Sequence, residues 1–176
     1  LTIIGNVGQA RTKGAEFDLT YQVDQDFTLS VAGSYNDSKL KDPYYRNSDE
    51  RQAGGAPRAP IGQEMPFVPK LQMTAIARKS FELEGVPAFA QVALSHTGGS
   101  WSDLESAKRL WQNPYTIINT SFGYEGDDWS LTVFINNLTD TRAQIARYDP
   151  GYPSGLDTTT AVNRPRSVGM RFGQKF

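Results

Sequence analysis

The chain has 176 residues, the length of one ordinary domain. Its 18 lysines and arginines against 19 aspartates and glutamates give a net charge of −1, so there is no basic field to bind nucleic acid. The lack of cysteine excludes a disulfide scaffold and thiol catalysis, the single histidine (His96) argues against a histidine-rich metal centre, and no apolar run is long enough for a transmembrane helix.

Apolar and polar residues alternate with period two along most of the chain, which is typical of β-strands with unlike faces. Residues 16–23 alternate strictly, and we join them to the preceding residues as one long strand. The alternation is irregular through Arg11 and Lys13, so we expect a bulge near Gly14. No helical periodicity of comparable length occurs, and the chain is predicted to be all-β. The seven predicted strands span about residues 1–23, 27–36, 67–79, 88–100, 115–124, 129–138 and 165–176.

The connections between these strands alternate in length. The short ones cover residues 24–26, about 80–86 and 125–128, and the long ones cover about 37–66, 97–113 and 139–164. Outer-membrane barrels show this asymmetry, with short periplasmic turns and long extracellular loops, whereas a soluble sandwich has no reason to alternate its loops by length. We therefore predict an antiparallel, up-and-down transmembrane β-barrel.

Aromatic residues collect near both ends of the predicted strands, as expected for two girdles that bracket a lipid-facing apolar band. Those beside the short turns are Tyr21, Phe27, Phe81, Tyr124, Trp129, Phe172 and Phe176, and those beside the long loops are Tyr35, Phe67, Trp101 and Tyr115. Seven strands are too few to close a barrel, since the smallest bacterial examples have eight. We therefore expect a partial barrel with two open edges, whose missing strands belong to the same protein.

Three segments carry a family resemblance. The run from Asn6 to Glu16 (NVGQARTKGAE), the segment Asn137-Leu138-Thr139-Asp140, and Arg164-Pro165-Arg166 before a strand ending in Phe176 resemble motifs of TonB-dependent outer-membrane receptors. The resemblance implies that residues 1–176 are the C-terminal part of a 22-stranded barrel domain. The family's plug domain, TonB box and signal peptide have no counterpart in this chain. The resemblance also implies that the protein lies in the outer membrane of a Gram-negative bacterium, with the lipid bilayer, TonB and the barrel assembly machinery as partners. Phe176 would then be part of the assembly signal, or it is an ordinary girdle residue.

The long loops combine aromatic rings with arginines, which suits contact with a bulky small-molecule ligand through stacking and charge-assisted hydrogen bonds. Plain packing within the loops is the alternative reading, and the loop charges balance, so a strongly anionic ligand is not indicated. The candidate ligand-binding residues are Tyr44, Tyr45, Arg46, Arg51, Trp101, Arg109, Trp111, Arg147, Tyr148 and Tyr152.

Other polar residues have simpler interpretations. We expect Asn137 to Asp140 to cap the end of a strand, and His96 to be a structural residue rather than a metal ligand. A solvated channel wall or contact with a plug explains the residues on the polar strand faces, which include Glu16, Asp18, Gln72, Arg78, Gln91, Asn119 and Arg171. Glu16 and Asp18 have no companion catalytic groups, so we expect neither an enzyme nor a cofactor or metal site.

The resemblance leads us to expect a receptor for TonB-dependent uptake of a bulky, scarce nutrient, with a ferric siderophore as the leading substrate class. A passive outer-membrane channel or a small structural barrel is the alternative.

Overall fold

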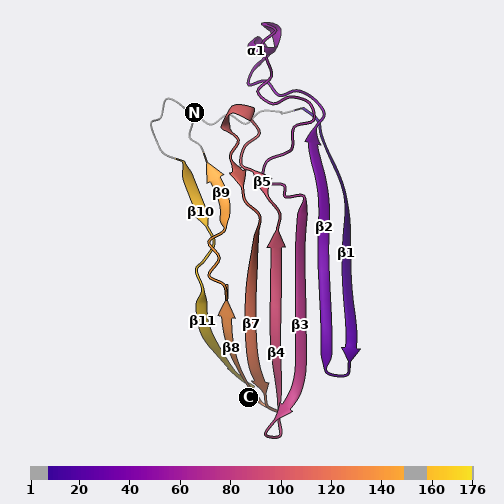
Figure 1. Ribbon diagram of the computed structural model, residues 1–176, viewed down its shortest axis with the longest axis vertical. Coiled ribbons are helices and arrows are strands. Elements are labelled where there is room, and N and C mark those ends of the chain that lie inside the picture. Colours follow the sequence, from indigo (N-terminus) through magenta and orange to yellow (C-terminus); the bar gives the residue numbers. More distant parts are fainter. Residues whose placement is uncertain (1–7, 149–157, 176) are drawn as a thin grey trace.

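The computed structural model describes residues 8–148 and 158–175, and one antiparallel sheet of seven strands dominates them. The sheet stands as a tall, twisted wall, with tight turns at one end and long loops at the other (Figure 1). Its strands follow one another in the order β1-β2-β3-β4-β7-β8-β11, which confirms the predicted up-and-down topology. They are β1 (Ala10–Asp24), β2 (Phe27–Leu40), β3 (Leu71–Leu83), β4 (Val86–Thr97), β7 (Tyr115–Glu125), β8 (Trp129–Asn136) and β11 (Ser167–Gln174).

The long loops carry small elements that the sequence patterns did not predict. Two small hairpins and two single helical turns lie at the loop end of the sheet (Figure 1). Segments of two to five residues are too short to display a period of either 2 or 3.6, which explains why they were missed. They are α1 (Ser48–Gln52), β5 (Ser100–Trp101), η1 (Ser106–Lys108), β6 (Trp111–Gln112), β9 (Gln144–Tyr148) and β10 (Thr159–Val162).

The predicted strand ends need correction, most of all at β3. This strand runs over Leu71–Leu83 rather than 67–79, because Phe67 has a left-handed backbone (φ 56°) and donates its N–H to the carbonyl of Trp101, outside the sheet. The following turn consists of Glu84 and Gly85, both with positive φ, as a two-residue hairpin turn requires. The second strand extends beyond its predicted end to Leu40, and the last two strands are shorter than predicted.

The predicted bulge near Gly14 is absent, and that prediction was wrong. Gly14 pairs with Asn36, and pairing between β1 and β2 is continuous from Ala10 to Gln22, with an irregularity only beyond Gln22. Arg11 and Lys13 therefore share a face with Phe17. The sequence pattern becomes irregular there because the strand changes composition, not because it changes register.

The register separates two faces of the sheet, as the alternation predicted. The polar face includes Glu16, Asp18, Ser34, Gln72, Arg78, Gln91, Asn119, Ser121, Thr132 and Arg171. The apolar face includes Phe17, Leu19, Tyr21, Leu29, Val31, Met73, Ala75, Val92, Leu94, Ile118, Phe122, Val133, Ile135, Val168, Met170 and Phe172. Its large side chains are exposed even at the strand centres, with Leu19 at 61% and Met170 at 69%.

Little of this sheet is enclosed by protein. The accessible surface is 12138 Å², whereas a compact soluble protein of 19.5 kDa has roughly 8,500 Å². The buried apolar residues are few and lie mainly where loops cover strand ends: Leu40, Ala59, Ala88, Phe89 and Ala143. None of the helices in the described ranges is long and apolar enough to cross a membrane. A two-faced sheet with exposed edges at β1 and β11 is the architecture expected of part of a barrel wall.

Candidate functional site

Three long loops leave the same end of the sheet, and they contain all the candidate ligand-binding residues (Figure 1). We call residues 41–70 loop A, residues 98–114 loop B and residues 137–166 loop C. Residues 149–157 of loop C, which include Tyr152, lie outside the described residues, as does Phe176.

Loop A carries α1 at its tip and is held closed by a narrow stem. Tyr44 and Ala59 form an isolated β-bridge, and Ala59 is fully buried. The Asn47 side chain caps α1 by accepting the N–H of Glu50, and the Glu50 carboxylate accepts the N–H of Arg46 and pairs with Arg58. The Arg58 guanidinium holds the pKa of the Glu50 carboxyl below its usual value. Loop A is therefore an ordered structure with its own polar contacts.

Glu105 joins loop A to loop B. Its carboxylate lies 3.6 Å from Arg46, 3.5 Å from Arg58 and 3.4 Å from Lys108, and only 13% of its side chain is exposed. Ser106 reinforces this junction by donating its N–H to the carbonyl of Arg58 (2.8 Å). The two loops are consequently held together by charged groups from both.

A second cluster surrounds the Trp101 ring at the base of loops A and B. Trp111 packs edge-to-face against Trp101 (5.1 Å between centroids), and the guanidinium of Arg109 lies 4.4 Å from its ring centroid. The Trp101 Nε1–H donates to the carboxylate of Glu64, which also pairs with Lys70. Lys70 is the main reason that the pKa of Glu64 is lowered, and burial lowers the pKa of Arg109.

Loop C packs against loop B through Arg147 on β9. The Arg147 guanidinium donates to the carbonyl of Trp111 (3.1 Å), and the Arg147 N–H donates to the side chain of Gln112, which is buried. All three loops are thus connected, and Arg147 provides the link from loop C.

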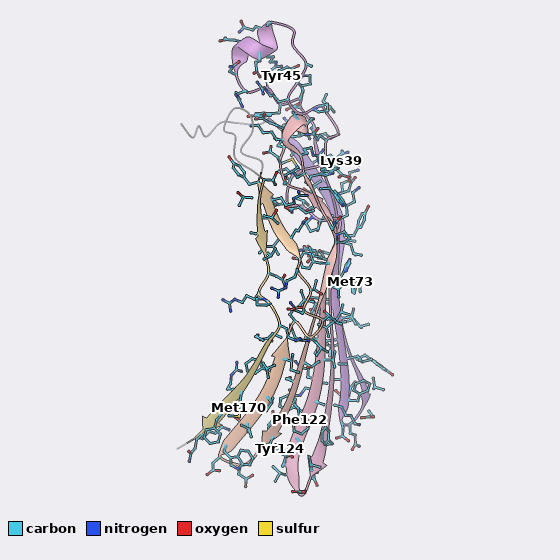
Figure 2. All side chains as sticks on the ribbon, turned by 60° about the vertical axis from the view of Figure 1, so that its left-hand side comes forward. Lys39, Tyr45, Met73, Phe122, Tyr124 and Met170 are labelled. Atoms are coloured by element: carbon cyan, nitrogen blue, oxygen red, sulfur yellow. The ribbon has the colours of Figure 1, made fainter. Side chains whose placement is uncertain are left out.

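The structure divides the candidate ligand-binding residues into two groups. Arg46, Trp101, Arg109, Trp111 and Arg147 hold loops together, and the backbone of Tyr44 fixes the stem of loop A. The second group consists of Tyr45, which is half-buried and lies near α1 at the far tip (Figure 2), and two exposed residues, Arg51 on α1 and Tyr148, which is 62% exposed.

The sequence interpretation missed Glu64, Glu105 and Arg58, whose charges organise the loops. The balance of acidic and basic residues in each loop was a signal of such internal pairing. Groups of three or more metal-binding side chains do not occur in the described residues.

The polar face of the sheet forms ion and ring contacts near the turn end. Arg78 pairs with Glu125 (3.0 Å) and lies 3.7 Å from the ring centroid of Phe89. Gly123 opposite makes room for this ring, since a Cβ there would lie 2.5 Å from Phe89 Cε1. A hollow of about 530 Å³, lined in part by Glu16, Asp18 and Gln72, lies along the sheet rather than among the loops. These contacts suit a polar wall and include no catalytic arrangement that we recognise.

The topology of the sheet, its polar and apolar faces and its long loops together define this chain as part of the wall of a β-barrel of the outer-membrane type. The family model described as TonB dependent receptor-like, beta-barrel matches residues 2–138. The chain therefore belongs to this family.

Three solved structures share the fold. The ferric yersiniabactin uptake receptor FyuA from Yersinia pestis is 19% identical, with 97% of this chain and 24% of that chain covered and a TM-score of 0.77. The siderophore receptor PiuA from Acinetobacter baumannii is 20% identical, with 95% of this chain and 22% of that chain covered and a TM-score of 0.69. BauA, the ferric preacinetobactin receptor from Acinetobacter baumannii, is 16% identical, with 94% of this chain and 22% of that chain covered and a TM-score of 0.65. This chain thus spans about a quarter of the length of each, and at these identities the likeness concerns the fold.

Proposed function

We propose that this chain forms part of the wall and the long loops of an outer-membrane receptor that imports a bulky, scarce nutrient, with a ferric siderophore as the substrate class. The observation that carries the proposal is the family match over residues 2–138. The names of the three similar structures, which describe receptors for siderophores or their ferric complexes, support this substrate class. The proposed role is binding and transport rather than catalysis.

The proposal assigns residues 1–176 to the C-terminal part of one barrel domain. The remaining strands and a plug domain would come from the rest of the same protein. Two observations support this assignment: the chain covers only 22–24% of the similar structures, and within residues 8–148 and 158–175 neither edge of the sheet has a neighbouring strand. The assembled barrel would lie in the outer membrane of a Gram-negative bacterium, with the barrel assembly machinery and TonB as partners.

In the proposed mechanism, the loops capture the ligand and pass it to the plug, whose displacement is driven through TonB. Within this chain, Arg51 and Tyr148 would make first contact, because both are exposed, and the half-buried Tyr45 would contribute from the tip of loop A. The pairing of loops A, B and C would keep these residues in place, and the polar face would line the route through the barrel.

The test is an uptake assay with the complete gene. A strain that lacks this gene should no longer grow with one ferric siderophore from a defined panel as its iron source, and it should no longer take up radioactive iron supplied as that complex. The intact gene should restore both growth and uptake. Loss of TonB in the same strain background should abolish that uptake. Uptake that persists without TonB would favour a passive channel, and unchanged uptake of every compound would contradict the proposed substrate class.

A further inference from the structure

Four basic side chains gather beside the apolar face of the sheet, at the loop end of β1 and β2. Arg11 and Lys13 lie on β1, Lys39 lies on β2 and Lys41 follows β2, and all four line a hollow of about 110 Å³. We call these four residues the basic cluster. Lys39 lies towards the loop end, whereas Tyr124 and Met170 lie near the turn end (Figure 2).

The register places the cluster on the outside of the wall. Arg11 lies opposite Lys39, Lys13 opposite Asp37, and Ala15 opposite Tyr35, without interruption. Residues two apart in a strand share a face, so these pairs continue the apolar face that carries Phe17 and Leu19. The cluster therefore faces the lipid side rather than the interior of the barrel.

The cluster begins within the layer of lipid headgroups and continues just above it, from where long basic side chains can reach down to the headgroups. Two residues advance about 7 Å along a strand, or about 5 Å in height at a tilt of about 40°. Lys13 thus lies about 5 Å above the Tyr35 ring level and Arg11 about 10 Å above it. The headgroup layer is roughly 5–8 Å thick on each side of the hydrocarbon core. Tyr35 marks the aromatic boundary, and the basic residues lie directly above it.

The cluster has an excess of positive charge. Asp37 is the only carboxylate lining the hollow, and it is already paired with Lys39 at 2.9 Å. In the described part of the chain, no carboxylate lies within ion-pair distance of Arg11, Lys13 or Lys41. The nearby Asp42 instead accepts the N–H of Gln9. Like charges directly opposite each other, as at Arg11 and Lys39, destabilise a sheet unless an anion lies between them.

The other end of the same face provides a contrast. Lys79 lies opposite Phe27 near the short turn, and its ammonium lies 3.1 Å from Asp24 and 3.8 Å from Asp26. Its charge is neutralised within the protein. The unpaired positive charge on this face of β1 to β3 therefore lies at the loop end, which faces the outer leaflet in the proposed orientation.

We propose that the basic cluster binds the phosphoryl groups of an anionic lipid in the outer leaflet of the membrane. The inference rests on the proposed outer-membrane location. Arginine can grip two phosphate oxygens at once, and lysine side chains supply point charges around them. Binding would remove the repulsion between Arg11 and Lys39 and would anchor the paired ends of β1 and β2 at a fixed depth.

The test is a titration of the complete receptor, purified in a neutral detergent, with fluorescent diphosphorylated lipid A. The triple variant R11Q/K13Q/K41Q should bind roughly 100-fold more weakly, since three of the four basic residues are lost. The charge-preserving variant R11K/K13R/K41R should stay within a few-fold of the unchanged protein. Heat-dependent migration of the barrel on gels checks that each variant is folded. Should the triple variant fail to fold, Lys41→Gln alone, outside the strand, should still weaken binding about fivefold.

Four further results distinguish the lipid from other ligands, and this inference from the proposed function. Dephosphorylated lipid A should bind equally weakly to all variants, and equal affinity for both lipids in the unchanged protein would overturn the inference. If inorganic phosphate at the same concentration as lipid A competed with it, the basic cluster would be a site for free phosphate, and the lipid inference would be wrong. If the receptor inserts into the membrane and imports iron, but the triple variant binds lipid A as tightly as the unchanged protein does, this inference is refuted and the proposed function is not. A complete protein that does not insert into the outer membrane refutes the proposed function.

Discussion

At the scale of single residues, Asn137 is the centre of the junction where β8 ends and loop C begins. Only 3% of the residue is exposed, and its backbone is left-handed (φ 54°). Its side chain accepts the N–H of Thr141 and donates to the carbonyls of Thr141 and Arg164. This confirms the expected strand-end cap.

Asp140 completes that cap from the other side of the turn. Its carboxylate accepts the N–H of Arg166, the main cause of its lowered pKa. The two side chains join the beginning and the end of loop C.

We expect Asn137→Ala to destabilise the folded barrel by about 2–3 kcal/mol, because its part-buried hydrogen bonds to the backbone of Thr141 and Arg164 are lost and alanine disfavours positive φ. Denaturant unfolding of the complete receptor, followed by tryptophan fluorescence, measures the loss. Asn137→Gly keeps the backbone conformation accessible and separates the two effects. The matched control is Asn136→Ala at the exposed neighbouring position, and an equal loss there would contradict the assignment.

At the scale of elements, Glu105 couples loop A to loop B. We expect Glu105→Gln to loosen the junction while leaving the sheet unchanged, because the charge shared by Arg46, Arg58 and Lys108 is lost. Hydrogen exchange at the Ser106 N–H should accelerate about fivefold, corresponding to about 1 kcal/mol of local stability. Glu82→Gln, at an exposed position on β3, is the control. Acceleration in both variants, or in neither, would show that Glu105 does not join the loops.

The attachment of α1 should depend on pH. The pKa of Glu50 is lowered in the folded protein, first by Arg58 and then by the N–H of Arg46. The stabilisation is therefore fully present above the ordinary carboxyl pKa, roughly 4.3, and is lost as the pH falls through the lower folded value. A spin label at Gln52→Cys should become more mobile as the pH falls below the ordinary carboxyl pKa and through the lower pKa of Glu50 in the folded protein. The same label combined with Glu50→Gln should be mobile at every pH, and a pH-independent label in the unchanged background would contradict the prediction.

At the scale of the whole molecule, the sheet exposes both an apolar face and two strand edges. We expect residues 1–176, expressed alone, to aggregate in plain buffer and to need detergent, because large apolar side chains such as Leu19, Val168 and Met170 are more than half exposed. Analytical ultracentrifugation with and without detergent measures this. A soluble monomer that unfolds cooperatively in plain buffer would contradict the placement of the apolar face against lipid.

Much of the wall could be predicted because strand signals are local. The alternation from Glu16 to Val23 shows directly which side chains share a face, and the register confirms that division for the polar and apolar sets. Strand ends were less certain, as the shift of β3 to Leu71–Leu83 shows, since an end depends on where partner strands stop pairing.

The loops could be predicted only as a set of aromatic and basic residues. Composition indicated which residue types were present but not whether they would meet a ligand or one another. Trp101, Arg109 and Trp111 proved to pack together, whereas Tyr148 is exposed and Tyr45 is half-buried at the tip of loop A. Hydrogen bonds and ion pairs between loops form across large sequence separations, and no short-range period reports them.

The sequence by itself determined a two-faced, antiparallel wall with long loops at one end, because side-chain alternation and turn spacing are properties of neighbouring residues. Only the tertiary structure decided which distant groups meet. It brought Glu105 to Arg58, and through an unbroken register it set Arg11 and Lys13 on the apolar face of the sheet, beyond Tyr35. These placements depend on the paths of separate chain segments in space, and their energies arise only when those segments are brought together.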